Sequence, residues 1–320
     1  MDIFYFVIQQ TMFFFIPLLI VALGGMFSER SGVVNIALEG IMIIGGFASI
    51  LFINLMQNAG VEINSQLLLI FATLIAALAG GIFSLLHAFA SINMKADQVI
   101  SGTALNMFAP AFAIFVARMI QDVQQIQFTN VFRISSVPGL SKIPLIGPMF
   151  FENTYLTTYI GFAILIVSII IIRKTKFGLR LKSCGEHPQA ADTVGINVYH
   201  IRYSGVIISG ILAGIGGMVF VIPTSTNFSA DVAGYGFLAL AVLIFGQWKP
   251  IRIFIAALFF GLAKTISATY DVIPILSTSG IPNYIYKMIP FVATLVVLAF
   301  TSKKSQAPKA SGKPYDKGSR

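Results

Sequence analysis

Long apolar stretches dominate this sequence, and they most constrain what it can fold into. About nine of them follow one another, each roughly 15 to 25 residues long and separated by polar links. Helices and closed barrels alone satisfy their backbone hydrogen bonds within a bilayer. We therefore predict an all-α, polytopic membrane protein with about nine transmembrane helices, in a range of about eight to ten. The expected spans cover residues 6–26, 33–55, 67–91, 99–117, 156–172, 203–222, 231–246, 252–269 and 286–300.

Charge and cysteine content exclude several other classes of protein. Hydrophobic residues make up 57% of the chain and charged residues only 10%, which leaves no room for an appended soluble domain. The net charge of +9 would suggest a nucleic-acid partner in a soluble chain, but here we attribute it to basic cytoplasmic loops and expect no nucleic acid. The single cysteine, Cys184, rules out an internal disulfide and a cysteine-rich metal site.

Basic residues are concentrated on alternate links, which indicates the orientation of the chain. If the link at 173–202 is cytoplasmic, sixteen of the 21 Lys and Arg lie inside and three lie outside. The three outside are Arg118, Arg133 and Lys142. We expect the N-terminus outside and the C-terminus in the cytoplasm.

Two domains follow from this pattern. We expect residues 1–302 to form a transmembrane domain that includes a cytoplasmic loop at 173–202. Residues 303–320 are rich in Lys, Pro, Gly and Ser, and we expect a disordered basic cytoplasmic tail.

The 173–202 loop contains a short helix signal. Pro188 suits a first helical position, Ala190 and Ala191 favour a helix, and Gly195 suits a left-handed stop. A helix of about two turns is too short to be stable alone in water. One interpretation is a docking element for a soluble partner; the other is a solvated loop with an incidental helical turn.

The same loop carries a family resemblance. Gly178-Leu179-Arg180, then Gly185-Glu186-His187-Pro188-Gln189-Ala190-Ala191-Asp192, then Gly195-Ile196 resembles the cytoplasmic loop of ABC-importer permeases. That family serves simple sugars, nucleosides and branched-chain amino acids, and its loop carries a coupling helix that sits in a cleft of the ATPase subunit. The coupling residues that the resemblance implies are Gly185, Glu186, His187, Pro188, Ala190, Ala191, Asp192 and Gly195. One departure is His187, where the family often has Asn, a stronger helix cap.

Two further stretches resemble the nucleoside and simple-sugar permeases of this family: Asn35–Gly40 and Val99–Asn106. The resemblance implies a permease subunit of a bacterial ABC importer in the cytoplasmic membrane. Its partners would be an ABC ATP-binding subunit, a second permease subunit and an extracellular substrate-binding protein. The chain itself would bind no cofactor, because the partner subunit uses the ATP.

Polar residues near the spans are the candidates for a substrate path, because a charge that faces lipid is costly. They are Asn35, Glu39, Gln98, Asn106, Asp231 and Tyr235. The alternative for the acidic ones is that they cap helices or reach the interface. Lys264 lies deeper, and pairing with a carboxylate would explain it.

An enzyme is not expected. Gly261 to Thr265 resembles a phosphate-binding loop, but Ala263 stands where that motif needs Gly, so the chain has no ATPase site of its own. The spans hold no cluster of cations for an anionic solute, whereas amides, hydroxyls and aromatic rings suit a nucleoside. The alternatives are a simple-sugar or branched-chain amino acid permease, an ion-coupled secondary transporter, or a membrane anchor of another complex. The exact substrate and the make-up of the permease pair stay open.

Overall fold

The computed structural model describes residues 2–60, 62–273, 276, 282–301 and 306–317, and it is predominantly helical. The long helices are α1 (Asp2–Arg30), α2 (Leu38–Asn58), α3 (Ser65–Ala88), α4 (Gln98–Gln121), α6 (Leu156–Lys174), α9 (Val198–Thr224), α11 (Pro250–Thr269) and α13 (Asn283–Thr301). The shorter helices are α5 (Ile146–Phe150), α7 (Lys176–Glu186), α8 (Pro188–Thr193) and α10 (Tyr235–Phe245). A π-helical turn, η1 (Phe89–Asn93), extends α3, and a 3₁₀ turn, η2 (Leu140–Lys142), precedes α5.

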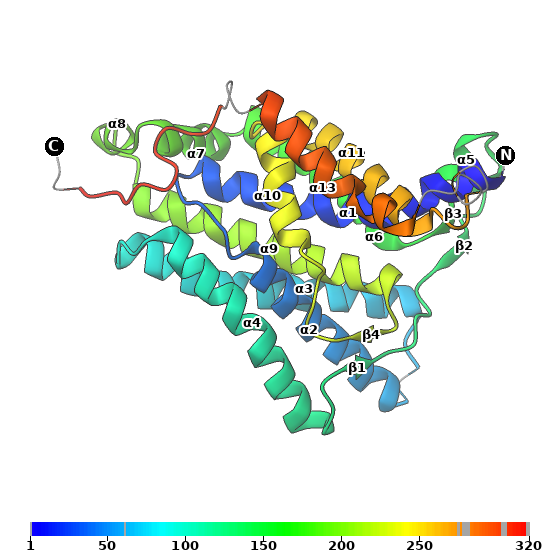
Figure 1. Cartoon of the computed structure of the whole chain (residues 1–320). Helices are drawn as coiled ribbons and strands as arrows, with labels where there is room; N and C mark the ends of the chain where they lie inside the picture. The colour runs from blue at the N-terminus through cyan, green and yellow to red at the C-terminus, as the bar shows by residue number, and fades with distance from the viewer. Residues whose placement is uncertain (1, 61, 274–275, 277–281, 302–305, 318–320) are drawn as a thin grey trace.

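Strands occur only as two short antiparallel pairs within the described chain. β1 (Ile126–Gln127) pairs with β4 (Asn227–Phe228), and β2 (Ile134–Ser136) pairs with β3 (Glu152–Thr154). In Figure 1, β2, β3 and α5 lie with the N-terminus at one end of the bundle, and α7 and α8 lie at the other.

The core of the bundle is α9, which packs against α1, α2 and α3. Its glycines permit this approach. A Cβ atom at Gly210, Gly214 or Gly217 would overlap atoms of α3 or α2, so only the hydrogen of glycine fits.

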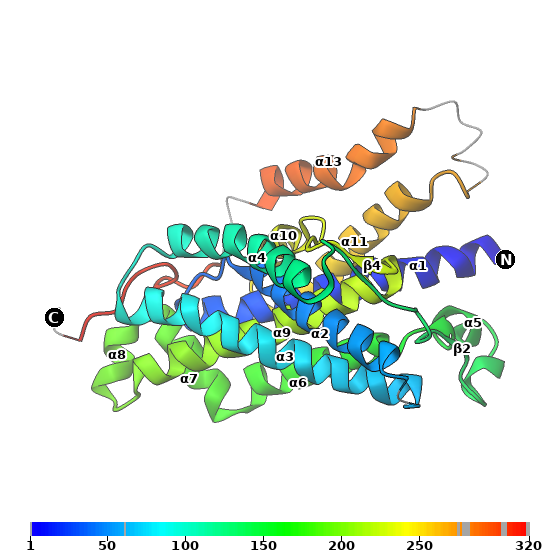
Figure 2. The same ribbon diagram turned by 90° about the horizontal axis from the view of Figure 1, so that it is seen from below.

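Helix α4 lies at the edge of the bundle, as the view in Figure 2 also shows. Only 17% of the residues in its most apolar 18-residue stretch are buried, and Met107 is 73% exposed. Such a face suits lipid or a second membrane protein rather than water.

Seven helices in the described part of the chain are long and apolar enough to cross a membrane: α1, α2, α3 with η1, α4, α6, α9 and α11. Two more apolar helices, α10 and the stretch Tyr284–Val296 in α13, are shorter. Every predicted span therefore coincides with an apolar helix. The predicted count of nine crossings depends on the two short ones.

The link between α1 and α2 differs from the prediction. The expected span began at residue 33, but α2 begins at Leu38, and residues 33–37 are non-helical although Val33, Asn35 and Ala37 are completely buried. Buried irregular backbone is stable only where other groups satisfy it. The side chains that do so are described below.

Candidate functional site

The predicted coupling loop forms two helices at one end of the bundle. Helix α7 begins where the Thr175 hydroxyl accepts a hydrogen bond from the Gly178 amide at 3.1 Å. Helix α8 follows directly after His187, with Pro188 at its first position. His187 makes no side-chain cap, in line with its weakness relative to Asn. Gly195 takes the left-handed conformation (φ +82°), and the Ile196 amide closes the turn on the Ala191 carbonyl at 3.0 Å.

Helix α8 has one buried face and one exposed face. Pro188 and Ala191 are buried, whereas Gln189 and Ala190 are exposed and Val194 just after the helix is 74% exposed. The helix is thus fixed to the bundle by one side and presents small and apolar groups on the other. A short, anchored helix of this kind can be gripped by a protein partner, while its own length could not keep it folded.

The chain near the C-terminus lies against this segment. Disorder was expected for 303–320. Residues 303–305 and 318–320 lie outside the described chain, but within 306–317 Pro308, Ala310 and Tyr315 are buried. The Ala310 amide donates to the Gly185 carbonyl at 2.8 Å, and the Gly312 amide donates to the Gly32 carbonyl at 3.2 Å. Composition alone indicated disorder because it carries no information on the backbone carbonyl acceptors that distant segments of the chain supply. We call residues 306–317 the C-terminal strap.

Arg202 in α9 fixes the strap most firmly. Its guanidinium is only 1% exposed, donates to the Lys313 carbonyl at 3.0 Å and lies 5.9 Å from the centroid of the Tyr315 ring. Tyr315 also packs edge-on against Tyr199 and interacts with the Asp192 carboxylate of α8. Burial, followed by that carboxylate, raises the pKa of Tyr315. The strap therefore covers a buried cation and contacts α8.

An ion pair and a buried thiol also belong to the end of the bundle that holds α7 and α8. Lys95, between η1 and α4, forms an ion pair with the strap's Asp316 at 3.0 Å. Cys184 in α7 is buried, and burial raises the pKa of its thiol to about 11. The strap thus joins the α1–α2 link, the α3–α4 link, α7 and α9.

Three predicted path residues satisfy the non-helical link between α1 and α2. Gln98 accepts from the Val34 amide at 2.7 Å. Asn106 accepts from the Gly40 amide at 2.7 Å and donates to the Ile36 carbonyl at 2.8 Å. Asn35 donates to the Ser209 hydroxyl at 2.9 Å. Together these amides attach the link to α4 and α9.

His87, which the sequence left without a role, belongs to the same network. One of its ring nitrogens lies 2.8 Å from the Val34 carbonyl oxygen and the other 2.7 Å from the Ser101 hydroxyl. The imidazole therefore connects α3, the link and α4.

Glu39 forms the N-terminal cap of α10. Its carboxylate accepts from the Gly234 amide at 2.9 Å and from the Gly236 amide at 2.5 Å. These are two of the amides that a helix start leaves without a partner. Glu39 at the start of α2 is thus in direct contact with the start of α10.

The other predicted path residues are less closely involved. Asp231 is exposed, and its carboxylate accepts from the Ala233 amide at 2.9 Å. Tyr235 is buried, with its hydroxyl unpaired within the described residues. The Lys264 ammonium lies 5.9 Å from the centroid of the Tyr235 ring, and no carboxylate of the described residues pairs with it.

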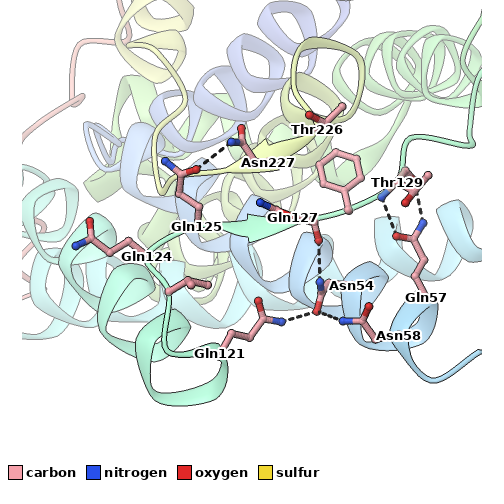
Figure 3. A pocket seen from close by; sticks show the side chains of 12 residues that line it. Asn54, Gln57, Asn58, Gln121, Gln124, Gln125, Gln127, Thr129, Thr226 and Asn227 are labelled. Carbon is pink, nitrogen blue, oxygen red and sulfur yellow. Dashed lines mark hydrogen bonds between the residues drawn. The ribbon is translucent and has the colours of Figure 1, made fainter.

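An amide-rich cavity of about 1070 Å³ lies at the opposite end of the bundle (Figure 3). Helix α9 separates it from α8, because α8 precedes the start of α9 and β4 follows its end. Eight carboxamide side chains line it: Asn54, Gln57, Asn58, Gln121, Gln124, Gln125, Gln127 and Asn227. No lining residue is charged. None of the predicted path residues belongs to this cavity, since its walls come from helix ends and links that a search for polar residues within spans passes over.

Comparison with known proteins places the chain in a family. The family model described as the branched-chain amino acid transport system / permease component matches residues 7–298. The guanosine ABC transporter permease protein NupQ of Bacillus subtilis is 44% identical over 316 residues, which cover 98% of this chain and 97% of the relative. The nucleoside ABC transporter permease protein NupC of Lactococcus lactis is 42% identical over 314 residues, 97% and 96% of the two chains.

A more distant relative is named for a different substrate. The putative glucose ABC transporter permease protein TsgC13 of Haloferax volcanii is 29% identical over 311 residues, 91% of this chain and 89% of the relative. No solved structure gives a significant match. The family match and the two nearly full-length relatives confirm the resemblance seen in the loop at 173–202, and the chain belongs to the ABC-transporter permeases of the branched-chain amino acid transport system / permease component family.

Proposed function

We propose that this chain is the membrane-spanning permease subunit of an ATP-driven importer that carries nucleosides across the bacterial cytoplasmic membrane. The observation that carries the proposal is the likeness to NupQ and NupC, whose printed names specify guanosine and nucleosides, over nearly the whole of each chain. The uncharged, amide-rich cavity agrees with a polar solute that has no phosphate.

In this proposal, α8 is the coupling helix. Its exposed face at Gln189, Ala190 and Val194 enters a cleft of the ATP-binding subunit, and its buried face at Pro188 and Ala191 passes the movement on to α7 and α9. The chain has no phosphate-binding loop, so ATP hydrolysis belongs to that partner. A second permease subunit packs on this one, and the exposed apolar face of α4 is a suitable surface.

The proposal includes an orientation. The end that holds α7, α8 and the C-terminal strap faces the cytoplasm, and the cavity end faces outward. Both α10 and α13 complete the count of nine crossings, with the N-terminus outside. Basic residues support this assignment: Arg173, Lys174, Lys176, Arg180 and Lys182 all lie at the α7 end.

The polar residues that attach the α1–α2 link and cap α10 have a structural role in this proposal that also serves transport. Glu39 and Asn106 hold two broken helices against each other at the place where a path through the subunit would need irregular backbone. They set the shape of the path, and changes in them alter rate more than preference.

A simple-sugar importer is the second candidate, because TsgC13 carries glucose in its printed name. Deletion of the gene separates the two. We expect the deletion strain to lose uptake of labelled guanosine and adenosine, to keep uptake of glucose and ribose, and to regain nucleoside uptake from a plasmid copy. Loss of sugar uptake with normal nucleoside uptake would assign the second function instead.

The coupling role has a direct test as well. Affinity-tagged wild-type chain should capture the ATP-binding subunit from solubilised membranes. Ala190→Asp, on the exposed face of α8, should lose that capture, whereas Asp231→Asn in the link before α10 should keep it. Equal capture by both variants would remove α8 from the docking surface.

A further inference from the structure

The amide-rich cavity contains a preorganised cluster centred on Asn54. This side chain is only 8% exposed. Its carbonyl oxygen accepts from the Gln121 amide at 2.5 Å and from the Asn58 amide at 3.1 Å, and its own amide donates to the Gln127 carbonyl at 2.7 Å. Asn54 thus accepts two hydrogen bonds on its oxygen and donates one, and it fixes the orientation of Asn58 and Gln121 (Figure 3).

That orientation leaves acceptors available. Because Asn58 and Gln121 donate to Asn54, each keeps a carbonyl oxygen that has no hydrogen-bond partner within the described chain. A carboxamide in solution rotates freely, but these two cannot turn without breaking their bond to a buried group. Two fixed acceptors at a cavity wall are an arrangement that recognises N–H groups.

The facing wall supplies a donor. The Gln125 carbonyl oxygen accepts from Asn227 at 2.9 Å across the β1–β4 pair, so its NH₂ group is left available. Gln124 and the side chain of Gln127 make no hydrogen bond within the described residues and add both donors and acceptors. Gln57, by contrast, is used on both atoms by the backbone of Thr129.

The cavity therefore offers fixed donors and acceptors and no charge. The edges of purine bases and the ribose hydroxyls need this mixture, and carboxamides pair with adenine edges in other proteins. A phosphate would gain nothing, because no cation lines the wall. The volume of about 1070 Å³ exceeds what one nucleoside needs and leaves space for water.

We propose that this cavity is a nucleoside-binding site of the permease itself. It receives an uncharged purine nucleoside at the outer mouth through the oxygens of Asn58 and Gln121, the NH₂ group of Gln125 and the side chains of Gln124 and Gln127. The inference rests on the proposed function, which says that nucleosides pass through this subunit. It adds that the permease selects for the base, in addition to any selection by the external binding protein.

The test uses the complete transporter purified into nanodiscs, with no binding protein present. We expect saturable binding of labelled guanosine that unlabelled adenosine displaces and guanosine monophosphate does not. The double variant Gln121→Ala/Gln125→Ala should weaken guanosine binding at least about tenfold, because a site built for hydrogen bonds loses its partners. Val131→Ala changes an exposed apolar residue that does not line the cavity and should bind like wild type.

A second pair of variants covers a possible folding defect. Gln124→Ala/Gln127→Ala removes two side chains that make no hydrogen bond within the described chain, so its folding is unaffected and its guanosine affinity should fall. Wild-type guanosine affinity in both double variants would overturn the inference. If the double variants no longer capture the external binding protein but bind guanosine as wild type does, the inference would also be overturned. The cavity would then be a docking surface for the binding protein.

These outcomes separate the inference from the proposed function. If the wild-type strain takes up guanosine but both double variants of the nanodisc transporter bind it normally, only the cavity assignment fails. If wild-type cells take up no nucleoside through this transporter, the proposed function fails first.

Discussion

The cap that Glu39 places on α10 gives a prediction whose size follows from the structure. In Glu39→Ala, the amides of Gly234 and Gly236 lose their only side-chain acceptor in a buried region. An unsatisfied buried donor costs about 1–3 kcal/mol, so the variant should lose about 2–6 kcal/mol of stability. Glu39→Gln keeps one acceptor oxygen but turns an NH₂ group toward the second amide, and it should lose about half as much.

Thermal unfolding of the purified subunit in detergent measures this difference. We expect Glu39→Ala to lower the melting temperature by at least about 4 °C, with Glu39→Gln between it and wild type. Asp231→Ala is the matched control, because it removes an exposed carboxylate whose one hydrogen bond within the described chain is to the Ala233 amide. If Glu39→Ala melts like wild type but abolishes uptake, Glu39 acts on the substrate path directly and the capping argument is refuted.

Three more predictions concern the end of the bundle that holds α8. Ala190→Asp should abolish nucleoside uptake at normal membrane abundance, because it places a charge on the exposed face of α8; normal uptake, measured with labelled guanosine, would contradict it. Tyr315→Ala should release the C-terminal strap and lower capture of the ATP-binding subunit several-fold in pull-downs, and unchanged capture would leave the strap without a role in coupling. A membrane-impermeant maleimide should label Leu145→Cys but not Val194→Cys in intact cells, and the reverse result would invert the orientation. The native Cys184 gives little background in that assay, because it is buried and burial raises the pKa of its thiol to about 11, so little of the reactive thiolate is present at neutral pH.

The sequence predicted the helical, membrane-spanning class because apolar length is a strong signal that depends on no distant contact. It also predicted α8 and its glycine stop, since Pro188 and Gly195 act locally. It placed the start of α2 five residues too early, because Val33 to Ala37 is apolar enough for a span and the amides that hold it in a non-helical form lie on α4.

Long-range contacts account for what was missed. The strap reads as a disordered tail because its order depends on Gly32, Gly185 and Arg202, which are more than a hundred residues away in the sequence. The cavity combines the ends of α2 and α4 with β1 and β4, and no local pattern announces that these four segments meet. Glu39 was identified as important, but its partner is an amide pair with no side chain to suggest it.

Reconstitution tests the central claim most directly. The chain, its second permease and the ATP-binding subunit would be placed in liposomes, with the external binding protein and labelled guanosine outside and ATP inside. Labelled guanosine inside the vesicles would be measured over time. We expect accumulation against a gradient that requires ATP and that Ala190→Asp abolishes. Accumulation driven by an ion gradient without ATP, or ATP-driven accumulation of sugar with no guanosine, would contradict the account.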